Sequence, residues 1–263
     1  MKSDSILDVI CAEKRVDLEA EKAVVGFDEM LQRAQASAVR ACFKDALKKA
    51  SGVPKVIAEL KKASPSRGLI RADFDARKLA VELENAGAAA LSVLTERRHF
   101  LGGDENLSAA AQAVKIPLLC KDFIFDKYQI CKARVLGASA VLLIARILDD
   151  SELAELLAFA KSLSLDALCE VHTEEEIARV VGVGAEIVGV NCRNLKSFET
   201  DFSITERLLG RVPAGVVRVA ESAIEDNAML LRARDAGADA ALIGTSIMAK
   251  KNPAEALKAL IGR

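Results

Sequence analysis

A lysine suited to acid–base chemistry stands directly after a short apolar run of this sequence. Lys121 follows Ile116–Cys120, which is too short for a helix and typical of a buried strand. A partly buried lysine can donate or accept a proton near neutral pH. The alternative is a solvated lysine that begins a loop, and Lys121 alone does not decide between the two.

Other expected strands end in the same way, on residues of useful chemistry. Glu59 and Lys61 lie two positions apart at the first strand end, so their side chains point in the same direction. Later strand ends and their neighbours supply Glu170, Asn191, Arg193 and Glu221. Buried charges must be mutually compensated or reserved for a charged ligand. Each alone fits an ordinary rim salt bridge, but the whole set in register with strand ends favours a site.

Two loops near the C-terminus are candidates for binding phosphate. Ser222–Ala223–Ile224 and Gly244–Thr245–Ser246 follow the last two expected strands, where many barrels bind phosphate through backbone N–H groups. Ser64, in the loop after the first strand, could meet an anion together with Lys61. The alternative for each of these segments is an ordinary turn.

Four apolar residues lie beside the same strand ends. Phe100, Phe123, Leu142 and Leu195 could form the wall of a pocket of aromatic size. Taken singly, each is more often a core residue.

A recurring Gly–Ala pair indicates which elements position these residues. The pairs begin at Gly87, Gly137, Gly184 and Gly237, with separations of 50, 47 and 53 residues. Each pair follows an amphipathic stretch and precedes an apolar run, and glycine just past a helix end adopts the left-handed conformation at low cost. The pattern therefore predicts a repeated βαβα unit.

Four such units predict eight parallel strands. We expect them near residues 55–60, 89–94, 116–120, 139–144, 166–170, 186–191, 215–220 and 239–243. Alternating strands and helices of this number favour a (β/α)8 TIM barrel. An open doubly wound sheet is the alternative, although no GxGxxG motif follows the first strand.

Residues 1–50 lie outside the repeat and read as a helical extension. Fifty residues are marginal for independent folding, so we expect this extension to pack on the barrel, with residues 1–263 as one domain.

Composition narrows the classes of partner. Lysine plus arginine (37) nearly balance aspartate plus glutamate (38), which argues against nucleic acid and membrane surfaces as partners. No apolar run reaches the length of a membrane span, and the polar N-terminus is unlike a secretory signal. Six cysteines without a CxxC pair, and two histidines, predict reduced thiols and no metal site. We therefore expect a cytoplasmic protein.

Eight stretches taken together resemble indole-3-glycerol phosphate synthase. They are Ile57–Gly68, Leu91–Glu96 with Phe100, Cys120–Phe123, Leu142–Ile144, Glu170–His172, Gly189–Leu195, Ala220–Ile224 and Leu242–Thr245. They occur in the family's order, and the strings Glu–x–Lys–x–x–Ser–Pro–Ser and Asn–x–Arg–Asn–Leu are specific to it.

The resemblance implies closure of the ring of 1-(2-carboxyphenylamino)-1-deoxyribulose 5-phosphate, followed by loss of carbon dioxide and water. By family pattern Lys121 is the general acid, Glu170 transfers protons during dehydration, and Lys61 is a second acid and phosphate contact. The remaining family roles fall on Glu59 and Glu221 as partners of the lysines, Asn191 and Arg193 as substrate ligands, and Ser222, Ala223, Gly244 and Thr245 as a phosphate cradle. The family uses no cofactor and no metal. We expect a monomer or weak homo-oligomer that binds a small phosphosugar.

One departure from the family concerns Ala223, where the family usually has glycine. A positive φ there would cost alanine about 1 kcal/mol. We expect a negative φ, which leaves the N–H available.

Two other functions remain open at this stage. A phosphoribosylanthranilate isomerase would carry a cysteine early in the first strand, where this chain instead ends the strand with Glu59 and Lys61. A non-catalytic barrel would be expected to have lost Lys61, Lys121 or Glu170, and all three are present.

Overall fold

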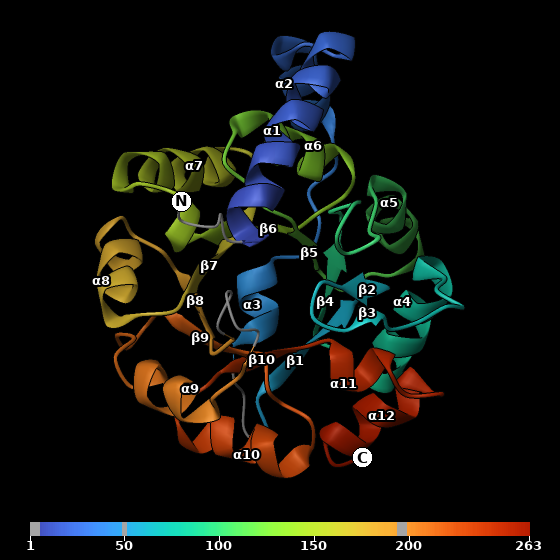
Figure 1. Ribbon diagram of the computed structural model, residues 1–263, viewed down its shortest axis with the longest axis vertical. Coiled ribbons are helices and arrows are strands. Elements are labelled where there is room, and N and C mark those ends of the chain that lie inside the picture. The colour runs from blue at the N-terminus through green and yellow to red at the C-terminus, as the bar shows by residue number, and fades with distance from the viewer. Residues whose placement is uncertain (1–5, 49–51, 194–198) are drawn as a thin grey trace.

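A closed barrel of eight parallel strands forms the centre of the molecule (Figure 1). The computed structural model describes residues 6–48, 52–193 and 199–263. Around the barrel the order is β1, β4, β5, β6, β7, β8, β9 and β10, after which β10 pairs with β1. The bounds are β1 Lys55–Leu60, β4 Ala90–Leu94, β5 Leu118–Lys121, β6 Ala140–Ile144, β7 Asp166–Val171, β8 Ile187–Asn191, β9 Val217–Glu221 and β10 Ala240–Ile243. The predicted TIM barrel is confirmed, and the open-sheet alternative is wrong.

Strand boundaries differ from the expected ones by up to two residues. β5 begins at Leu118 and not at Ile116. Pro117 intervenes, and its nitrogen has no hydrogen to donate to a strand ladder. The strand includes Lys121, so this lysine is the last residue of β5 and not the first residue of the following loop.

Helices follow the strands and cover the outside of the barrel (Figure 1). They are α4 Ala76–Ala86, α5 Asp104–Ala113, α6 Lys127–Val135, α7 Asp150–Ser162, α8 Glu174–Gly182, α9 Phe202–Leu209, α10 Asn227–Asp235, α11 Thr245–Met248 and α12 Pro253–Leu260, with a 3-10 turn η1 at Ala145–Ile147. The four glycines of the Gly–Ala pairs all have positive φ. They reverse the chain between helix and strand, as predicted.

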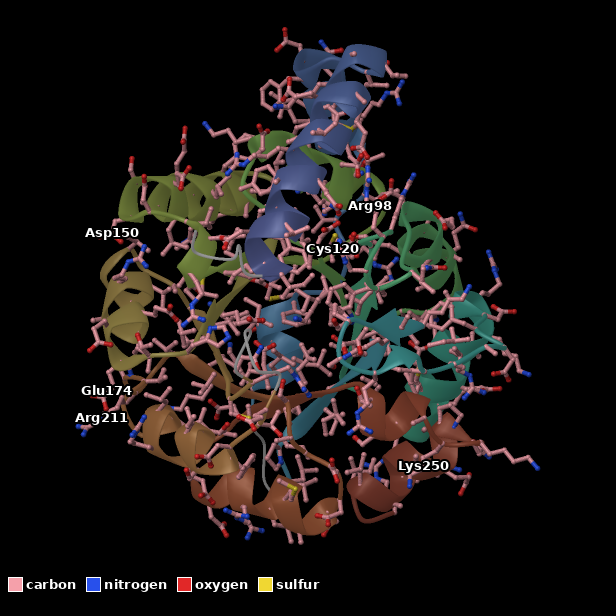
Figure 2. All side chains as sticks on the ribbon, viewed as in Figure 1. Arg98, Cys120, Asp150, Glu174, Arg211 and Lys250 are labelled. Atoms are coloured by element: carbon pink, nitrogen blue, oxygen red, sulfur yellow. The ribbon has the colours of Figure 1, made fainter. Side chains whose placement is uncertain are left out.

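Short additions complete the outer layer. β2 (Ala63–Ser64) and β3 (Gly68–Leu69) form a small antiparallel hairpin after β1. Charged side chains cover the outer surface of the molecule (Figure 2), where Arg211 Nε, just after α9, lies 3.5 Å from Glu174 Oε2 at the start of α8. Among the described helices, none combines the length and apolar character needed to cross a membrane.

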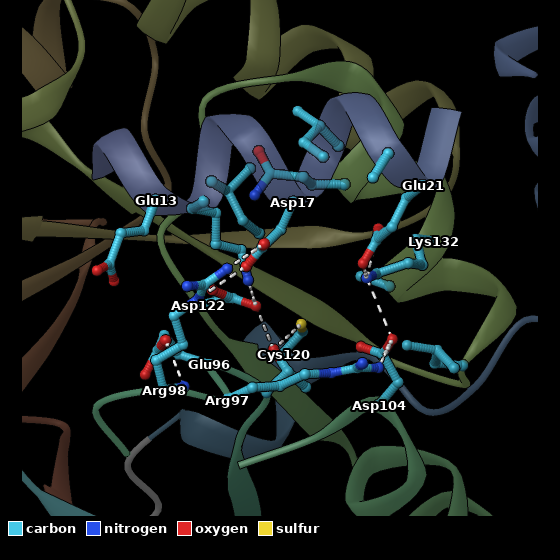
Figure 3. Close-up of a pocket in the computed structure, with 18 residues that line it drawn as sticks. Glu13, Asp17, Glu21, Glu96, Arg97, Arg98, Asp104, Cys120, Asp122 and Lys132 are labelled. Carbon is cyan, nitrogen blue, oxygen red and sulfur yellow. Dashed lines mark hydrogen bonds and ion pairs between the residues drawn. The ribbon is translucent and has the colours of Figure 1, made fainter. Parts of the chain in front are cut away.

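The N-terminal extension consists of three helices, α1 (Ile6–Val24), α2 (Phe27–Ala36) and α3 (Phe43–Leu47). α1 lies over the loops after β4 and β5, above a crevice of about 420 Å³ (Figure 3). Lys14 Nζ is 2.5 Å from Asp122 Oδ2, and Asp17 pairs with Arg98. The extension therefore contacts Asp122, which directly follows Lys121 in the chain.

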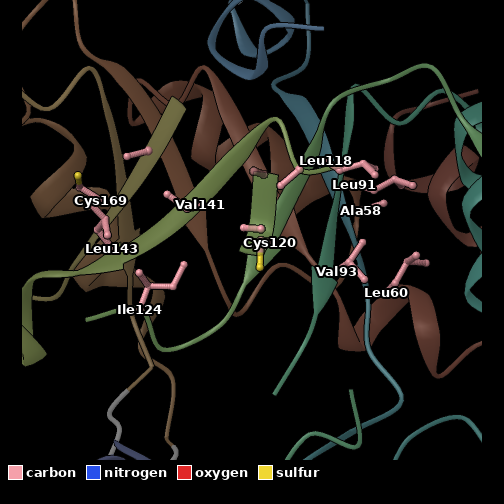
Figure 4. Close-up of a cluster of buried hydrophobic side chains, with 14 of the residues drawn as sticks. Ala58, Leu60, Leu91, Val93, Leu118, Cys120, Ile124, Val141, Leu143 and Cys169 are labelled. Carbon is pink, nitrogen blue, oxygen red and sulfur yellow. The ribbon is translucent and has the colours of Figure 1, made fainter. Parts of the chain in front are cut away.

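Two apolar layers stabilise the barrel. Outward side chains of the strands, such as Leu91, Val93 and Leu118, pack against the helices (Figure 4). Inward side chains, such as Ile57 and Leu168, fill the interior. This alternation follows from the two-residue period of a strand. It also places Glu59, Lys121, Glu170 and Glu221 on the inward face, at the carboxyl ends of their strands.

α3 closes the end of the barrel at which the strands begin, opposite to their carboxyl ends (Figure 1). Phe43 and Leu47 are completely buried and belong to the interior cluster. The backbone N–H of Lys44 donates to Asp166 Oδ2 at 2.9 Å, at the start of β7. The extension thus contacts both ends of the barrel.

We predict that the extension unfolds together with the barrel. Phe43→Ala leaves a cavity inside the barrel and should lower the free energy of unfolding by about 3–5 kcal/mol in urea titrations. The control Val24→Ala removes a side chain of the same extension that is 84% exposed, and should change it by less than about 0.5 kcal/mol. A separate early transition, or a small effect of Phe43→Ala, would contradict one shared folding unit.

Candidate functional site

A cavity of about 630 Å³ opens at the carboxyl ends of the strands. Predicted site residues from all eight barrel strands or their following loops line it together: Glu59, Lys61, Phe100, Lys121, Phe123, Leu142, Glu170, Asn191, Arg193, Glu221, Ser222, Ala223, Gly244 and Thr245. Glu59 and Thr245, which are 186 positions apart in the chain, therefore meet in one space, because parallel strands of a barrel all end on the same side.

The first strand supplies an ion pair to this cavity. Lys61 Nζ lies 2.5 Å from Glu59 Oε2, and both side chains are largely buried. Gly244 makes room for the pair, because a Cβ on this residue would lie 2.1 Å from Glu59 Oε2 and 3.1 Å from Lys61 Cε. Any larger residue at position 244 would displace the ion pair.

Lys121 lies among carboxylates at the floor of the cavity. Its Nζ is 3.4 Å from Glu170 Oε2 and 3.8 Å from Glu221 Oε2. Burial acts to lower the pKa of Lys121, but the charges of Glu170, Glu221 and Glu59 outweigh it and raise the pKa above its usual value. Lys121 is therefore an ammonium ion at neutral pH.

Glu170 and Glu221 differ in their electrostatic environments. Burial acts to raise the pKa of Glu170, but Lys121, His172 and an Asn191 hydrogen bond outweigh it and lower the pKa. Burial raises the pKa of Glu221 to about 8, helped by the charges of Glu170 and Glu59 and only partly offset by Lys121. The pKa values of the two carboxyls are thus shifted in opposite directions, and Glu221 keeps its proton to higher pH than Glu170.

Asn191 links the sixth strand of the barrel to the seventh. Its Oδ1 accepts hydrogen bonds from Ser222 Oγ at 2.8 Å and from the backbone N–H of Arg193 at 3.0 Å. With its oxygen so occupied, the amide nitrogen is left to donate to Glu170. The amide therefore has a fixed orientation in the cavity.

An apolar wall faces these polar groups. The ring centroids of Phe100 and Phe123 are 6.1 Å apart, and Leu94, Leu142 and Ile144 continue the wall. One side of the cavity is therefore suited to an aromatic ring, and the other to charged or hydrogen-bonding groups.

Comparison with known proteins now identifies the family. The family model for indole-3-glycerol phosphate synthase matches residues 7–260. The chain belongs to the indole-3-glycerol phosphate synthase family. The synthase of Koribacter versatilis is 48% identical, with 98% of this chain and 99% of that relative covered. The synthase of Mycolicibacterium smegmatis is 42% identical, with 99% and 95% covered.

Solved structures of other enzymes share the fold of this synthase family member. The 3-hexulose-6-phosphate synthase of Salmonella typhimurium matches with a TM-score of 0.65 at 13% identity, covering 79% of this chain and 97% of that one. The thiamine phosphate pyrophosphorylase of Pyrococcus furiosus matches with a TM-score of 0.60 at 14% identity, covering 82% and 95%. At such low identity these matches support the barrel fold alone.

The expectation for Ala223, where the synthase family usually has glycine, is wrong. Its φ is +60°, and Ser222 before it has a φ of +70°. Two successive left-handed residues turn the chain sharply after β9, and this turn was invisible in the local sequence because neither residue favours it. Alanine bears a cost of about 1 kcal/mol here, yet the residue still lines the cavity.

One predicted ligand residue of the synthase site, Ser64, does not line the cavity. Ser64 is buried, and its Oγ contacts Ser66 Oγ at 3.4 Å, while Ser66 itself lines the cavity. Ser64 lies in β2 of the small hairpin, where its side chain is buried, and Ser66 lines the cavity in its place. Leu195 lies outside the described residues, and its part in the wall stays a prediction.

Sequence reasoning missed several lining residues, among them Arg67, Asp122 and Lys250. Asp122 lies between the cavity and the crevice beneath α1, and it accepts a hydrogen bond from Thr95 Oγ1 at 2.6 Å (Figure 3). Its position next to Lys121 was the signal that could have found it. Lys250 follows α11 and carries no comparable local signal.

We predict that Glu221 makes folding sensitive to pH. Between its ordinary pKa of 4.5 and about 8, the unfolded chain has lost the Glu221 proton whereas the folded chain retains it. Raising the pH across this window therefore favours unfolding, and Glu221→Gln removes this effect. In urea titrations from about pH 5 to about pH 9, the wild type should lose stability relative to Glu221→Gln. A difference that stays constant with pH would contradict the protonated carboxyl.

Proposed function

We propose that this protein converts 1-(2-carboxyphenylamino)-1-deoxyribulose 5-phosphate to indole-3-glycerol phosphate. The substrate has a phosphate, a ketose carbonyl and a carboxylated aromatic ring, and the cavity offers complementary groups for each. The observation that carries the proposal is the buried Lys121 ammonium between an aromatic wall and the Ser222–Thr245 side of the same cavity.

Lys121 acts as the general acid of ring closure. When the aromatic carbon attacks the ketose carbonyl, negative charge develops on the carbonyl oxygen, and an alkoxide is basic enough to take a proton from an ammonium of raised pKa. Such positioned proton transfer contributes about 10² to 10⁴ in rate. Loss of carbon dioxide then releases the electron pair that restores the aromatic ring.

Dehydration completes the reaction and needs a base and an acid. Glu170 acts as the base, because its lowered pKa keeps it ionised. Lys61 acts as the acid toward the departing hydroxyl and is oriented by Glu59. Glu221 helps to orient Lys121 and carries a proton of its own. The overall reaction is redox neutral and needs no electron carrier. We propose that these residues supply every proton transfer, without a cofactor or a metal.

The phosphate binds at the last two strand ends. Ser222 and Ala223 after β9, and Gly244 and Thr245 after β10, line this side of the cavity. Their backbone N–H groups suit a phosphate, and Lys61 adds positive charge. Asn191 and Arg193 bind the sugar chain and the carboxylate, while Phe100, Phe123 and Leu142 hold the aromatic ring, with Ser64 supporting through Ser66.

We also propose a cytoplasmic monomer or weak homo-oligomer. All six cysteines are free thiols, as is usual in a reducing compartment. The cavity of about 630 Å³ is of the size that binds small ligands, which supports a small phosphosugar as the binding partner.

The direct test mixes the purified protein with the carboxyphenylamino substrate and follows indole fluorescence with time. We expect continuous formation of indole-3-glycerol phosphate in the absence of added metal or cofactor. No product at micromolar enzyme would overturn the proposed function.

Lys121→Ala should lower kcat by about 10² to 10⁴, because the developing alkoxide loses its proton donor. The control Lys161→Ala removes a lysine that is 80% exposed on α7, and should leave kcat unchanged. Near-full turnover by Lys121→Ala would assign the acid role to another residue.

A further inference from the structure

A buried histidine lies behind Glu170. His172 follows β7, and because side chains alternate along a strand it shares a face with Glu170. Its side chain is 7% exposed and does not line the cavity. His172 therefore cannot touch a substrate and can act only through its neighbours.

The imidazole stands between two carboxylates. Its Nε2 is 3.6 Å from Glu170 Oε1, and its Nδ1 is 3.6 Å from Glu176 Oε2. Among the residues that the structure describes, neither ring nitrogen has a hydrogen-bond partner at closer range. A neutral imidazole has one N–H and could serve one carboxylate, whereas an imidazolium could donate to both.

Glu176, on the other side of the imidazole from Glu170, has polar partners of its own. It lies in the first turn of α8, and its Oε2 accepts the backbone N–H of His172 at 2.6 Å. Its Oε1 is 3.7 Å from Arg146 Nε. Burial acts to raise the pKa of Glu176, but the nearby imidazole of His172, the hydrogen bond from the His172 backbone N–H and the charge of Arg146 outweigh it and lower the pKa. Glu176 is therefore a fixed anion that orients the imidazole.

We propose that His172 is a positioning residue that holds Glu170 by donating from Nε2 to Oε1, while the hydrogen bond from its backbone N–H to Glu176 Oε2 keeps the ring in place. Glu170 then has its second oxygen, Oε2, directed toward Lys121. The 3.6 Å separation shortens to a hydrogen bond when substrate binds, as is common for contacts that are long in unliganded sites. This inference rests on the proposed function of the same cavity.

The charged groups around this chain agree with such a role. Lys121 and Glu221 face Glu170 from β5 and β9, while Glu176 faces His172 from α8 and pairs on its other side with Arg146 of η1. His172 is among the groups that lower the pKa of Glu170. Without His172 the pKa of Glu170 should rise, and less Glu170 would be ionised at a given pH.

Two variants separate positioning from simple packing. His172→Phe keeps a ring but removes both donors, and should lower kcat by about 10²-fold with little change in KM. The acidic limb of its kcat–pH profile should move to higher pH. His172→Gln retains an N–H donor with similar reach, and should recover kcat to within about tenfold of wild type with a smaller pH displacement. Equal losses in both variants, or an unmoved pH profile, would overturn the proposal.

A measurement without turnover distinguishes this inference from the proposed function. The chain has two histidines, so the ring signal of His172 is assigned by its loss in His172→Phe. In NMR spectra, that signal should move in both Glu170→Gln and Glu176→Gln, while the His99 signal stays in place. If wild type lacks synthase activity but these shifts occur, the proposed function fails and the contact stands. If the His172 signal is insensitive to Glu170→Gln, the positioning role fails.

Discussion

Buried charges at the mouth of the barrel must compensate one another, and the positions of the surrounding residues follow from this requirement. Lys61 and Lys121 bring two positive charges into a largely buried space, and Glu59, Glu170 and Glu221 bring up to three negative ones. Burial raises the pKa of Glu221, which favours its uncharged form and reduces the excess of negative charge. The same environment keeps Lys121 an ammonium and Glu170 a carboxylate, so one cavity holds carboxyl groups with pKa values shifted in opposite directions, an arrangement suited to successive proton transfers.

Space for these groups comes from glycine on the neighbouring strands. A Cβ on Gly189 would lie 2.0 Å from Glu221 Oε1, and one on Gly244 would lie 2.1 Å from Glu59 Oε2. Both glycines occupy inward positions of the barrel, where apolar side chains fill the lower layers. The change from filled to open interior therefore occurs just where the charged residues begin, and it converts a packed core into a binding cavity.

The N-terminal extension contacts both ends of the barrel. α3 places Phe43 and Leu47 in the closed end of the barrel, while α1 contacts the loops after β4 and β5 at the open end. Lys14 reaches Asp122, the neighbour of Lys121, and Glu13 Oε2 lies 2.8 Å from His99 Nε2, the neighbour of Phe100. Contacts remote from the cavity thus restrain residues on both its polar floor and its aromatic wall.

The barrel, its strand order along the chain and the polar residues at the strand ends could be predicted from the chain, because two-residue alternation and the Gly–Ala repeat are local patterns. Glu59, Lys121, Glu170, Asn191 and Glu221 could be found as strand-end residues for that reason. The left-handed backbone at Ala223, the burial of Ser64, and the contacts of Asp122 and His172 could be seen only in the folded molecule. The same is true of the opposite pKa shifts of Glu170 and Glu221, which are the same residue type at equivalent strand ends. These features depend on which groups from distant strands and helices come into contact, and local sequence patterns do not reveal such contacts.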